Sequence, residues 1–429
     1  MKIAIAGYGL EGKSNYQYYS KDSNNKITIV DEKQPEGTLP SGVEVKVGAG
    51  VLNELQDFDL VIRTAGLDPK KIKTNGKIWS STNEFFENCP APIIGVTGSK
   101  GKGTTASLIA SILRESGRNV HLVGNIGVPA LDALTDILDS DIVVYELSSF
   151  QLWDAVRSPH IAVVLYIEPE HLDVHSNMDE YLGAKSNIVK FQTSEDIVIY
   201  NQANRYSSDI ADISLGIRVP YQDEVYAHVA NGYFYYGEQK LCSIDDLTLP
   251  GVHNLDNACA AISAVYPYVQ DGEVIGRGIS KFKGLEHRLK LVNHINGVDY
   301  YDDSIATTPG SAIAAIASFD QPKILILGGS SKGADFSELA MKVVESNVRS
   351  VVLIGDEAPV IEDSLIKVGY RAIDNLGKDI DMDTVVKTVQ ANAEQGDVVI
   401  LSPACASFGM FKNYEDRGKQ FIAAVKQLG

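Results

Sequence analysis

The sequence contains few cysteines, and those present are scattered. Cys89, Cys242, Cys259 and Cys405 form no C-x-x-C pair, which argues against a disulfide framework and against a cysteine-based zinc site. Long hydrophobic runs are also missing. The run at residues 161–167 is among the longest, and it is far shorter than the roughly 20 residues that a membrane-spanning helix needs. We therefore expect reduced thiols and no membrane partner.

Positive charge is scarce as well. The 429 residues include 38 Lys and Arg against 56 Asp and Glu, which gives a net charge of −18. A nucleic acid is also negatively charged and would be repelled by this net charge, so we expect none among the partners. The apolar stretch before Gly7 is too short for the core of a signal peptide, and the expected location is the cytoplasm. Phosphate ligands are still compatible with this charge, because a local loop can override it.

Apolar strand-like runs alternate with helical stretches along the chain. This alternation predicts an α/β fold with parallel sheets and helices on both faces. Pro90 and Pro92 indicate a linker, and a third segment begins near Glu286. The expected strands include residues 2–6, 26–30, 93–96, 161–165, 323–327, 350–354 and 397–401.

A glycine-rich turn follows the first expected strand. Gly7-Tyr8-Gly9-Leu10-Glu11-Gly12 has the pattern G-x-G-x-x-G, and Asp31 ends the next strand, near the offset at which an acid meets a ribose hydroxyl. Such glycines let the backbone approach a phosphate at a helix N-terminus. A tight β–α turn without a ligand is the alternative, because Glu11 would repel a phosphate placed close to it.

A second glycine-rich loop follows the expected strand at residues 93–96. It reads Gly98-Ser99-Lys100-Gly101-Lys102-Gly103-Thr104-Thr105, and the apolar residues from Leu108 to Leu113 then lie on one face of a helix that Gly117 would end. In a P-loop, backbone N–H groups hold the phosphates, a lysine neutralises them and a hydroxyl reaches Mg²⁺. The usual motif has Ser or Thr directly after the lysine, whereas here Gly103 follows Lys102 and Thr104 comes one residue later. We predict a nucleoside triphosphate site, with a flexible basic loop as the alternative.

Candidate metal ligands follow the next apolar strands. Glu146 ends one strand at the sheet edge where α/β folds place ligands, which suits an Mg²⁺ ligand beside a triphosphate. His171 follows the strand at residues 161–165, where a solvated loop is the alternative. The residues alone give no reason to prefer Lys185 over Lys190 as a functional lysine.

Several blocks occur together in one order along nearly the whole chain. These are residues 97–104, Gly124-Asn125-Ile126-Gly127, residues 146–151, Glu170-His171-Leu172-Asp173, residues 251–258, Glu286-His287-Arg288, Asp303-Ser304-Ile305-Ala306-Thr307, residues 327–333 and residues 401–407. This order resembles the Mur ligase family of peptidoglycan synthesis, and the chain is most similar to the members that add glutamate. The resemblance implies three domains: a Rossmann-like domain at residues 1–90, a central P-loop ATPase-type domain at 91–285 and a C-terminal Rossmann-like domain at 286–429.

The resemblance also implies an ATP-dependent amide ligase. ATP would phosphorylate the terminal carboxylate of UDP-N-acetylmuramoyl-L-alanine, and the amine of glutamate would then displace the phosphate. D-Glutamate is the expected amino acid. L-Glutamate stays open, because Ile305 stands where a lysine is expected and relatives that add L-glutamate share this isoleucine. ATP and Mg²⁺ are the implied cofactors, and we expect a monomer with small-molecule substrates.

Other functions are compatible with single motifs. A ligase similar to folylpolyglutamate synthetase would share Gly103 but would lack the N-terminal domain. A nicotinamide-dependent oxidoreductase would use the first glycine loop and leave the P-loop unexplained. A nucleotide sensor without chemistry would bind nucleotide and show no turnover.

The family pattern assigns roles residue by residue. The catalytic residues would be Lys102, His171 and a carbamylated Lys185. The metal ligands would be Thr104, Glu146, His171 and the carbamylated Lys185. ATP would contact Gly98, Ser99, Lys100, Gly101, Lys102, Gly103, Thr104, Thr105, Asn254, Asn257, Arg288 and Asp303. The UDP-sugar would contact Leu10, Glu11, Asp31 and Asn125. Glutamate would contact Lys332, Ser407 and Tyr414.

Overall fold

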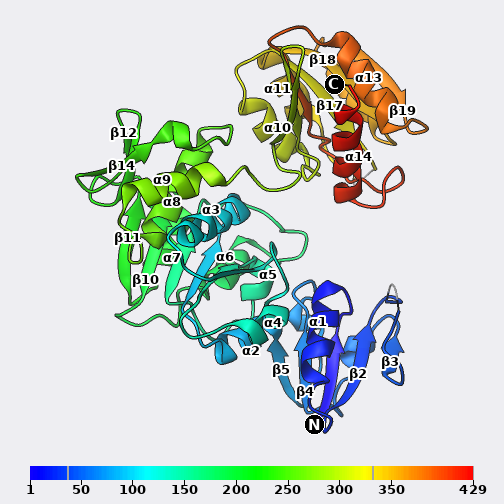
Figure 1. The fold of residues 1–429 in the computed structure, drawn as a ribbon. Coiled ribbons are helices and arrows are strands. Elements are labelled where there is room, and N and C mark those ends of the chain that lie inside the picture. Colours follow the sequence, from blue (N-terminus) through cyan, green and yellow to red (C-terminus); the bar gives the residue numbers. More distant parts are fainter. Residues whose placement is uncertain (36–37, 331–332, 429) are drawn as a thin grey trace. The chain divides into compact units, whose positions relative to one another are not determined.

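The computed structural model describes residues 1–35, 38–330 and 333–428, and the chain divides into two compact units. The first unit comprises Met1–Leu247 and Leu255–Phe282, and the second comprises Thr248–Asn254 and Lys283–Gly429. Figure 1 shows the helices and strands of each unit.

The first unit begins with a five-stranded parallel sheet in the order β3-β2-β1-β4-β5. The chain runs from β1 outward to β3 and then returns to β4 on the other side of β1. The carboxyl ends of β1 and β4 therefore flank the switch point at which doubly wound sheets bind ligands. The elements are β1 (Lys2–Ala6), α1 (Leu10–Tyr19), β2 (Lys26–Asp31), β3 (Glu44–Val47), β4 (Leu60–Arg63), β5 (Lys77–Ser80) and α2 (Ser81–Asn88).

A six-stranded parallel sheet in the order β11-β10-β9-β6-β8-β7 forms the rest of this unit's core. Its strands are β6 (Ile93–Thr97), β7 (Val120–Gly124), β8 (Ile142–Glu146), β9 (Ile161–Val164), β10 (Ile197–Asn201) and β11 (Ile217–Tyr221). The helices are α3 (Lys102–Glu115), α4 (Ala130–Ala133), α5 (Ser149–Leu152), α6 (Met178–Ser186), α7 (Arg205–Ala211), α8 (His253–Val265) and α9 (Gly272–Lys281). Leu108, Ile109, Ile112 and Leu113 of α3 are fully buried, which confirms the predicted apolar face.

The alternation of strands and helices did not predict a small antiparallel sheet in the first unit. Strands β12 (Ala227–Ala230), β13 (Tyr233–Tyr236) and β14 (Gln239–Ser243) form this meander. Asn231 and Gly232 join the first two strands with φ angles of 50° and 78°. Two residues with positive φ are typical of the tight turn that matches the twist of a β-hairpin.

The second unit contains a six-stranded sheet in the order β15-β16-β20-β17-β18-β19, in which only the β15–β16 pair is antiparallel. Ile324 and Ile326 pack in one apolar cluster, and Leu325 and Leu327 pack in another, so helices cover both faces as predicted. The strands are β15 (Lys290–Ile295), β16 (Val298–Asp302), β17 (Lys323–Gly328), β18 (Val348–Ile354), β19 (Ile373–Gly377) and β20 (Val398–Leu401). The helices are α10 (Pro309–Ala317), α11 (Ser337–Glu345), α12 (Ala358–Lys367), α13 (Met382–Asn392) and α14 (Tyr414–Lys426).

All four cysteines are free thiols. Burial raises the pKa of Cys89 and Cys259, and it raises the pKa of Cys242 to about 12. Across the described residues, no helix has the length and apolar character that crossing a bilayer requires.

Candidate functional site

The P-loop runs from the end of β6 into the first turn of α3. Gly98 and Gly101 have positive φ, and a Cβ on Gly101 would lie 2.3 Å from Oδ1 of Asn257. Thr105 Oγ1 also donates to that Asn257 oxygen, at 3.3 Å. The loop therefore needs its glycines for close packing, and α8 brings Asn257 against it. Two parts of the predicted nucleotide site are thus adjacent.

Lys102 is the first residue of α3, and its side chain folds back over the loop. Its Nζ donates to the carbonyl oxygens of Gly98 at 3.0 Å and Ser99 at 2.8 Å. The side chain therefore lies over the loop, close to the backbone N–H groups at the start of α3. This arrangement of donors and positive charge suits phosphate binding.

Lys185, on α6, lies on the other side of the same loop. Its side chain is almost completely buried, and its Nζ donates to the carbonyl oxygen of Gly98 at 2.7 Å. Burial lowers the pKa of Lys185 well below its usual value, and the charge of Lys102 lowers it further, against the opposing effect of Glu170 and Glu146. The structure thus distinguishes Lys185 from the exposed Lys190, which the residues alone did not.

Glu146 lies at the carboxyl edge of the central sheet. It is the last residue of β8, pairs in register with Val96 of β6, and is 5% exposed. Thr104, in the first turn of α3, is similarly buried at 6%. No group of three His, Cys, Asp or Glu that could hold a metal occurs in the described part of the chain. The hydroxyl and carboxylate oxygens present fit Mg²⁺, which prefers a few protein oxygens together with waters and substrate phosphates.

The loop after β9 is tied to the P-loop. Ser99 Oγ donates to the carbonyl oxygen of Glu168 at 2.9 Å and accepts from its backbone N at 3.0 Å. Tyr181 Oη lies 2.9 Å from Ser99 Oγ and donates to Glu170 Oε2 at 3.3 Å. Glu170 and Tyr181 were not among the predicted site residues, because their connection to the P-loop depends on tertiary contacts that no local sequence pattern reports.

His171 is exposed on this loop. It has a φ of 57°, and its ring centroid lies 4.9 Å from that of Phe150. Its Nε2 lies 3.8 Å from Oε2 of Glu170. His175, one helical turn later, is fully buried and stacks on Phe150. The His171 imidazole therefore lies beside the Phe150 ring and is still partly exposed.

The first glycine loop is built by close backbone contacts. A Cβ on Gly12 would lie 2.1 Å from the carbonyl oxygen of Gly7, so this position in the first turn of α1 has room only for glycine. Glu11 Oε2 accepts from the backbone N of Ala65 at 2.8 Å, and Asp31 Oδ2 accepts from the backbone N of Tyr8 at 2.8 Å. Both carboxylates thus organise the loops at the switch point, and Leu10 is exposed beside them.

Asn125 follows β7 at the same edge of the central sheet as Glu146. Its backbone N donates to the carbonyl oxygen of Glu146 at 3.4 Å, and its side chain is exposed. The predicted muramoyl-contacting residue and the predicted metal ligand are therefore neighbours.

In the second unit, Asp303 follows β16 and is buried. Its carboxylate accepts from Ser402 Oγ at 2.7 Å and from the backbone N of Leu289 at 3.2 Å. Burial raises the pKa of Asp303 to about 7, although the Ser402 hydrogen bond and the charge of the exposed Arg288 act in the opposite direction. Asn254 Nδ2 donates to the carbonyl oxygen of Pro250 at 2.7 Å.

Arg417, on α14, connects two of the blocks in the second unit. It is fully buried and donates to Ser304 Oγ at 2.9 Å, to the Ser304 carbonyl at 2.8 Å and to the Cys405 carbonyl at 3.1 Å. Ser407 is buried two residues beyond Cys405, and the Tyr414 carbonyl accepts from Ser304 Oγ at 2.7 Å. Lys332, the third predicted glutamate contact, lies outside the described residues. Arg417 was not among the predicted site residues.

Comparison with known proteins gives a consistent result. Residues 96–265 match the Mur ligase middle domain, and residues 287–405 match the Mur ligase glutamate ligase domain. The chain is 38% identical to UDP-N-acetylmuramoylalanine--D-glutamate ligase of Acetivibrio thermocellus and 36% identical to the protein of that name from Clostridium tetani. Each alignment covers 100% of this chain, together with 96% and 97% of the respective relative.

Solved structures share the fold. UDP-N-acetylmuramate-alanine ligase MurC from Thermotoga maritima has a TM-score of 0.63 at 17% identity, with 100% of both chains covered. MurF ligase from the same organism, solved in complex with ADP, has a TM-score of 0.60 at 17% identity and covers 100% of this chain and 95% of that one. With the matched domains and the full-length relatives, these findings show that the chain belongs to the Mur ligase family.

Proposed function

We propose that this protein is an ATP-dependent ligase that joins D-glutamate to UDP-N-acetylmuramoyl-L-alanine. The P-loop carries this proposal, because it has Lys102 at the start of α3, a buried Lys185 behind it and Glu146 at the adjacent strand end. The full-length relatives favour D-glutamate, since their names specify it. Substrates of this kind are made and used in the cytoplasm, which is the proposed location.

The reaction forms an acyl phosphate and then an amide. The substrate carboxylate attacks the γ-phosphorus of ATP, and ADP leaves. The neutral glutamate amine then attacks the acyl carbon, and inorganic phosphate leaves from the tetrahedral intermediate. The nitrogen releases one proton to solvent and keeps the other as the amide N–H. Such transfers depend on positioning and on charge neutralisation more than on a protein nucleophile. The N–H groups at the start of α3 and the ammonium of Lys102 supply both for the phosphates.

Metal ions would complete the charge balance. Thr104 and Glu146 would hold one Mg²⁺ ion, and His171 with a carbamylated Lys185 would hold another. When bound, these ions neutralise the phosphate oxygens of the nucleotide. The neutral amine of Lys185 would add to CO₂, forming an N–C bond and releasing one proton, and the side chain would then end in the two oxygens of a carbamate. Burial and the low pKa of this lysine support the step, because only the neutral amine is a nucleophile.

The remaining residue assignments rest on the family resemblance. The UDP-sugar would contact Leu10, Glu11, Asp31 and Asn125. ATP would contact residues 98–105, Asn254, Asn257, Arg288 and Asp303. Glutamate would contact Lys332, Ser407 and Tyr414. We assign these ligands to domains at residues 1–90, 91–285 and 286–429 of a monomeric enzyme.

Release of inorganic phosphate tests the proposed function. The purified protein is mixed with ATP, Mg²⁺, UDP-N-acetylmuramoyl-L-alanine and either D- or L-glutamate, and each component is omitted in turn. We expect release only with all components present and with D-glutamate. Release without the UDP-sugar would contradict the ligase assignment, and release with L-glutamate alone would reassign the amino acid. A reduced-nicotinamide absorbance in the purified protein would support an oxidoreductase instead.

A further inference from the structure

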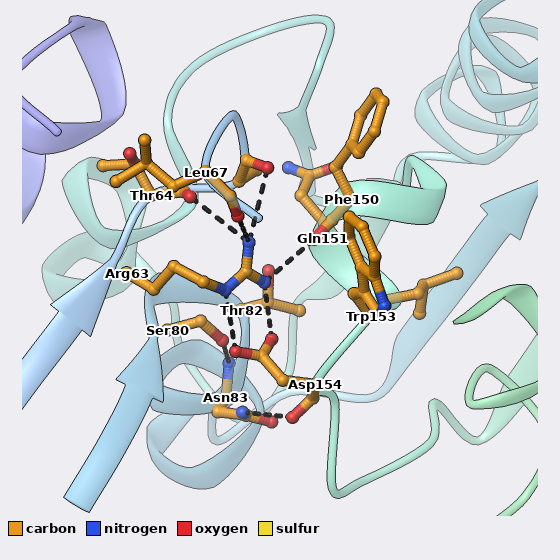
Figure 2. A network of polar contacts seen from close by, with 12 residues as sticks. Arg63, Thr64, Leu67, Ser80, Thr82, Asn83, Phe150, Gln151, Trp153 and Asp154 are labelled. Carbon is orange, nitrogen blue, oxygen red and sulfur yellow. Dashed lines mark hydrogen bonds and ion pairs between the residues drawn. The ribbon is translucent and has the colours of Figure 1, made fainter. Parts of the chain in front are cut away.

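The guanidinium of Arg63 is the centre of a buried polar network in the first unit. Arg63 ends β4 and is fully buried. Figure 2 shows its head group surrounded by acceptors from two sides. One side is the turn that follows β4, and the other is the segment at the end of α5. All three guanidinium nitrogens donate, so the network uses the full donor capacity of the side chain.

On one side, Arg63 shapes the turn that follows β4. Its Nη1 donates to the carbonyl oxygens of Thr64 and Ala65 at 3.3 Å each, and of Leu67 at 2.9 Å. This turn borders the first glycine loop, because Thr64 Oγ1 donates to the Ala6 carbonyl at 3.0 Å. The guanidinium therefore fixes the backbone turn on one side of the switch point, where β1 and β4 end.

On the other side, Arg63 binds the segment after Glu146. Its Nε and Nη2 donate to the two carboxylate oxygens of Asp154 at 2.9 and 2.6 Å, and Nη2 also donates to the Phe150 carbonyl at 2.9 Å. Helix α5 begins three residues after Glu146 and is held by a capping box of Ser148 and Gln151. The bidentate pair thus binds a short, capped segment that starts at the proposed metal ligand.

A second contact reinforces this junction. Asn83, on α2, donates from Nδ2 to the Asp154 carbonyl at 2.9 Å (Figure 2). Its Oδ1 accepts from the Val156 backbone N at 2.9 Å. The N-terminal sheet and the central sheet are therefore joined at two adjacent points around Asp154. A lysine at position 63 could not reproduce the fork of donors that this arrangement uses.

We propose that Arg63, acting through Asp154, is a positioning residue for the first chemical step. It fixes the loop of the N-terminal sheet that would hold the UDP-sugar relative to the Glu146 and P-loop edge of the central sheet. This role rests on the proposed function, because it concerns the approach of the substrate carboxylate to the γ-phosphate. A displacement of about 1 Å between reacting groups lowers a rate by about 10²-fold, so a rigid junction has a direct effect on turnover.

The kinetic test compares Arg63→Lys and Asp154→Asn with the wild-type enzyme. We expect kcat to fall by about 10²-fold in Arg63→Lys and by at least about tenfold in Asp154→Asn, with the KM values for ATP and glutamate changed by less than about twofold. Single-turnover trapping of the acyl phosphate should show the same loss, which places the defect in the first step.

A matched control exists in the second unit. Arg349 donates from Nε and Nη2 to the two oxygens of Asp397 at 2.8 and 3.1 Å, at the end of β20 that lies away from Asp303. Arg349→Lys and Asp397→Asn break a pair of the same geometry and should leave kcat within about twofold of wild type. A wild-type kcat in Arg63→Lys, or a loss no larger than in these controls, would overturn the positioning role.

Hydrogen exchange measures the local stability of this junction in the absence of substrates. In Asp154→Asn we expect faster exchange in both residues 64–67 and residues 149–155, and no change in the control variants at these segments. If the wild-type enzyme shows no ligase turnover, the proposed function fails, and the exchange data still decide whether the junction couples the two sheets. Unchanged exchange in either segment would overturn the coupling.

Discussion

Lys102 and Lys185 donate to the same oxygen, the carbonyl of Gly98, at 3.0 and 2.7 Å. Two ammonium groups on one acceptor would repel each other, and Lys185 is the more buried of the two. Burial is the main cause of its lowered pKa, and the charge of Lys102 adds to it. The neutral amine is therefore favoured at Lys185, which lies behind the loop, while Lys102 lies over the loop on the side of the proposed phosphates.

The lowered pKa of the buried Lys185 predicts that activity depends on dissolved CO₂. Wild-type enzyme prepared free of CO₂ should have low turnover, and bicarbonate should restore it. Lys185→Ala should lose turnover, and bicarbonate should not restore it, because no amine is present to form a carbamate. Phosphate release measures both effects, and ¹³C-bicarbonate should give a carbamate signal in the wild-type protein only. Lys190→Ala, which removes a nearby exposed lysine, is the control. Normal turnover in Lys185→Ala would refute the role.

The two lysines of the P-loop should differ in importance. Lys102→Met should lower kcat by about 10²- to 10³-fold, because it removes a cation aimed at the transferred phosphate. Lys100 is half-exposed and forms an ion pair with Glu168 at 2.6 Å, so Lys100→Met should cause a much smaller loss. Steady-state kinetics with saturating ATP measures the difference. Equal losses in the two variants would mean that the loop holds the phosphates in another way.

Asp303 predicts a specific pH dependence of stability. In the folded chain the pKa of Asp303 is raised to about 7 from its ordinary value of 3.8. Between these two pH values, the carboxyl group is therefore protonated in the folded state and ionised in the unfolded state. The wild type should therefore lose stability relative to Asp303→Asn as the pH rises from about 4 to about 7, by an amount on the order of a few kcal/mol, and the difference should then stay constant.

Urea unfolding at pH 4, 5.5, 7 and 8 measures this difference for Asp303. Asp363→Asn removes an exposed carboxylate from α12 of the same unit and should follow the wild type across the range. A constant difference between wild type and Asp303→Asn would show that the folded chain does not hold the extra proton.

Two glycines of the first motif give a paired test of its packing. A Cβ on Gly12 would lie 2.1 Å from the Gly7 carbonyl oxygen, whereas a Cβ on Gly9 would meet nothing within 4 Å. Gly12→Ala should therefore destabilise the protein by about 1–3 kcal/mol and raise the KM for the UDP-sugar, and Gly9→Ala should change stability by less than about 0.5 kcal/mol. Thermal unfolding and the KM values measure this, and similar behaviour of both variants would contradict the packing argument.

Local patterns predicted most of the fold. The expected strand at residues 2–6 has the bounds of β1, and the expected strands at 161–165 and 397–401 each differ by one residue from β9 and β20. Apolar periodicity reports these elements because both faces of each sheet are buried. The meander β12–β14 was missed, although Asn231-Gly232 is a hairpin signal, because the alternation of strands and helices dominated the interpretation.

The candidate site was predicted in part. The P-loop and Glu146 were predicted because each lies at the end of an apolar strand, and the sequence shows where these strands end. Lys185 could be selected only through the family resemblance, because its burial and its bond to Gly98 arise from tertiary packing. The Arg63–Asp154 pair joins residues 91 positions apart, and no periodic pattern connects such positions.

The state of the thiols has a practical consequence. Burial raises the pKa of Cys89, Cys242 and Cys259, so the thiolate form that alkylating reagents attack is rare for these three residues at neutral pH. Cys405 is buried, which limits the access of a reagent to it. A single cysteine introduced at an exposed position would react much faster than these. Fluorescent probes could therefore be attached to the native chain, without first replacing its own cysteines, and would report on motion during turnover.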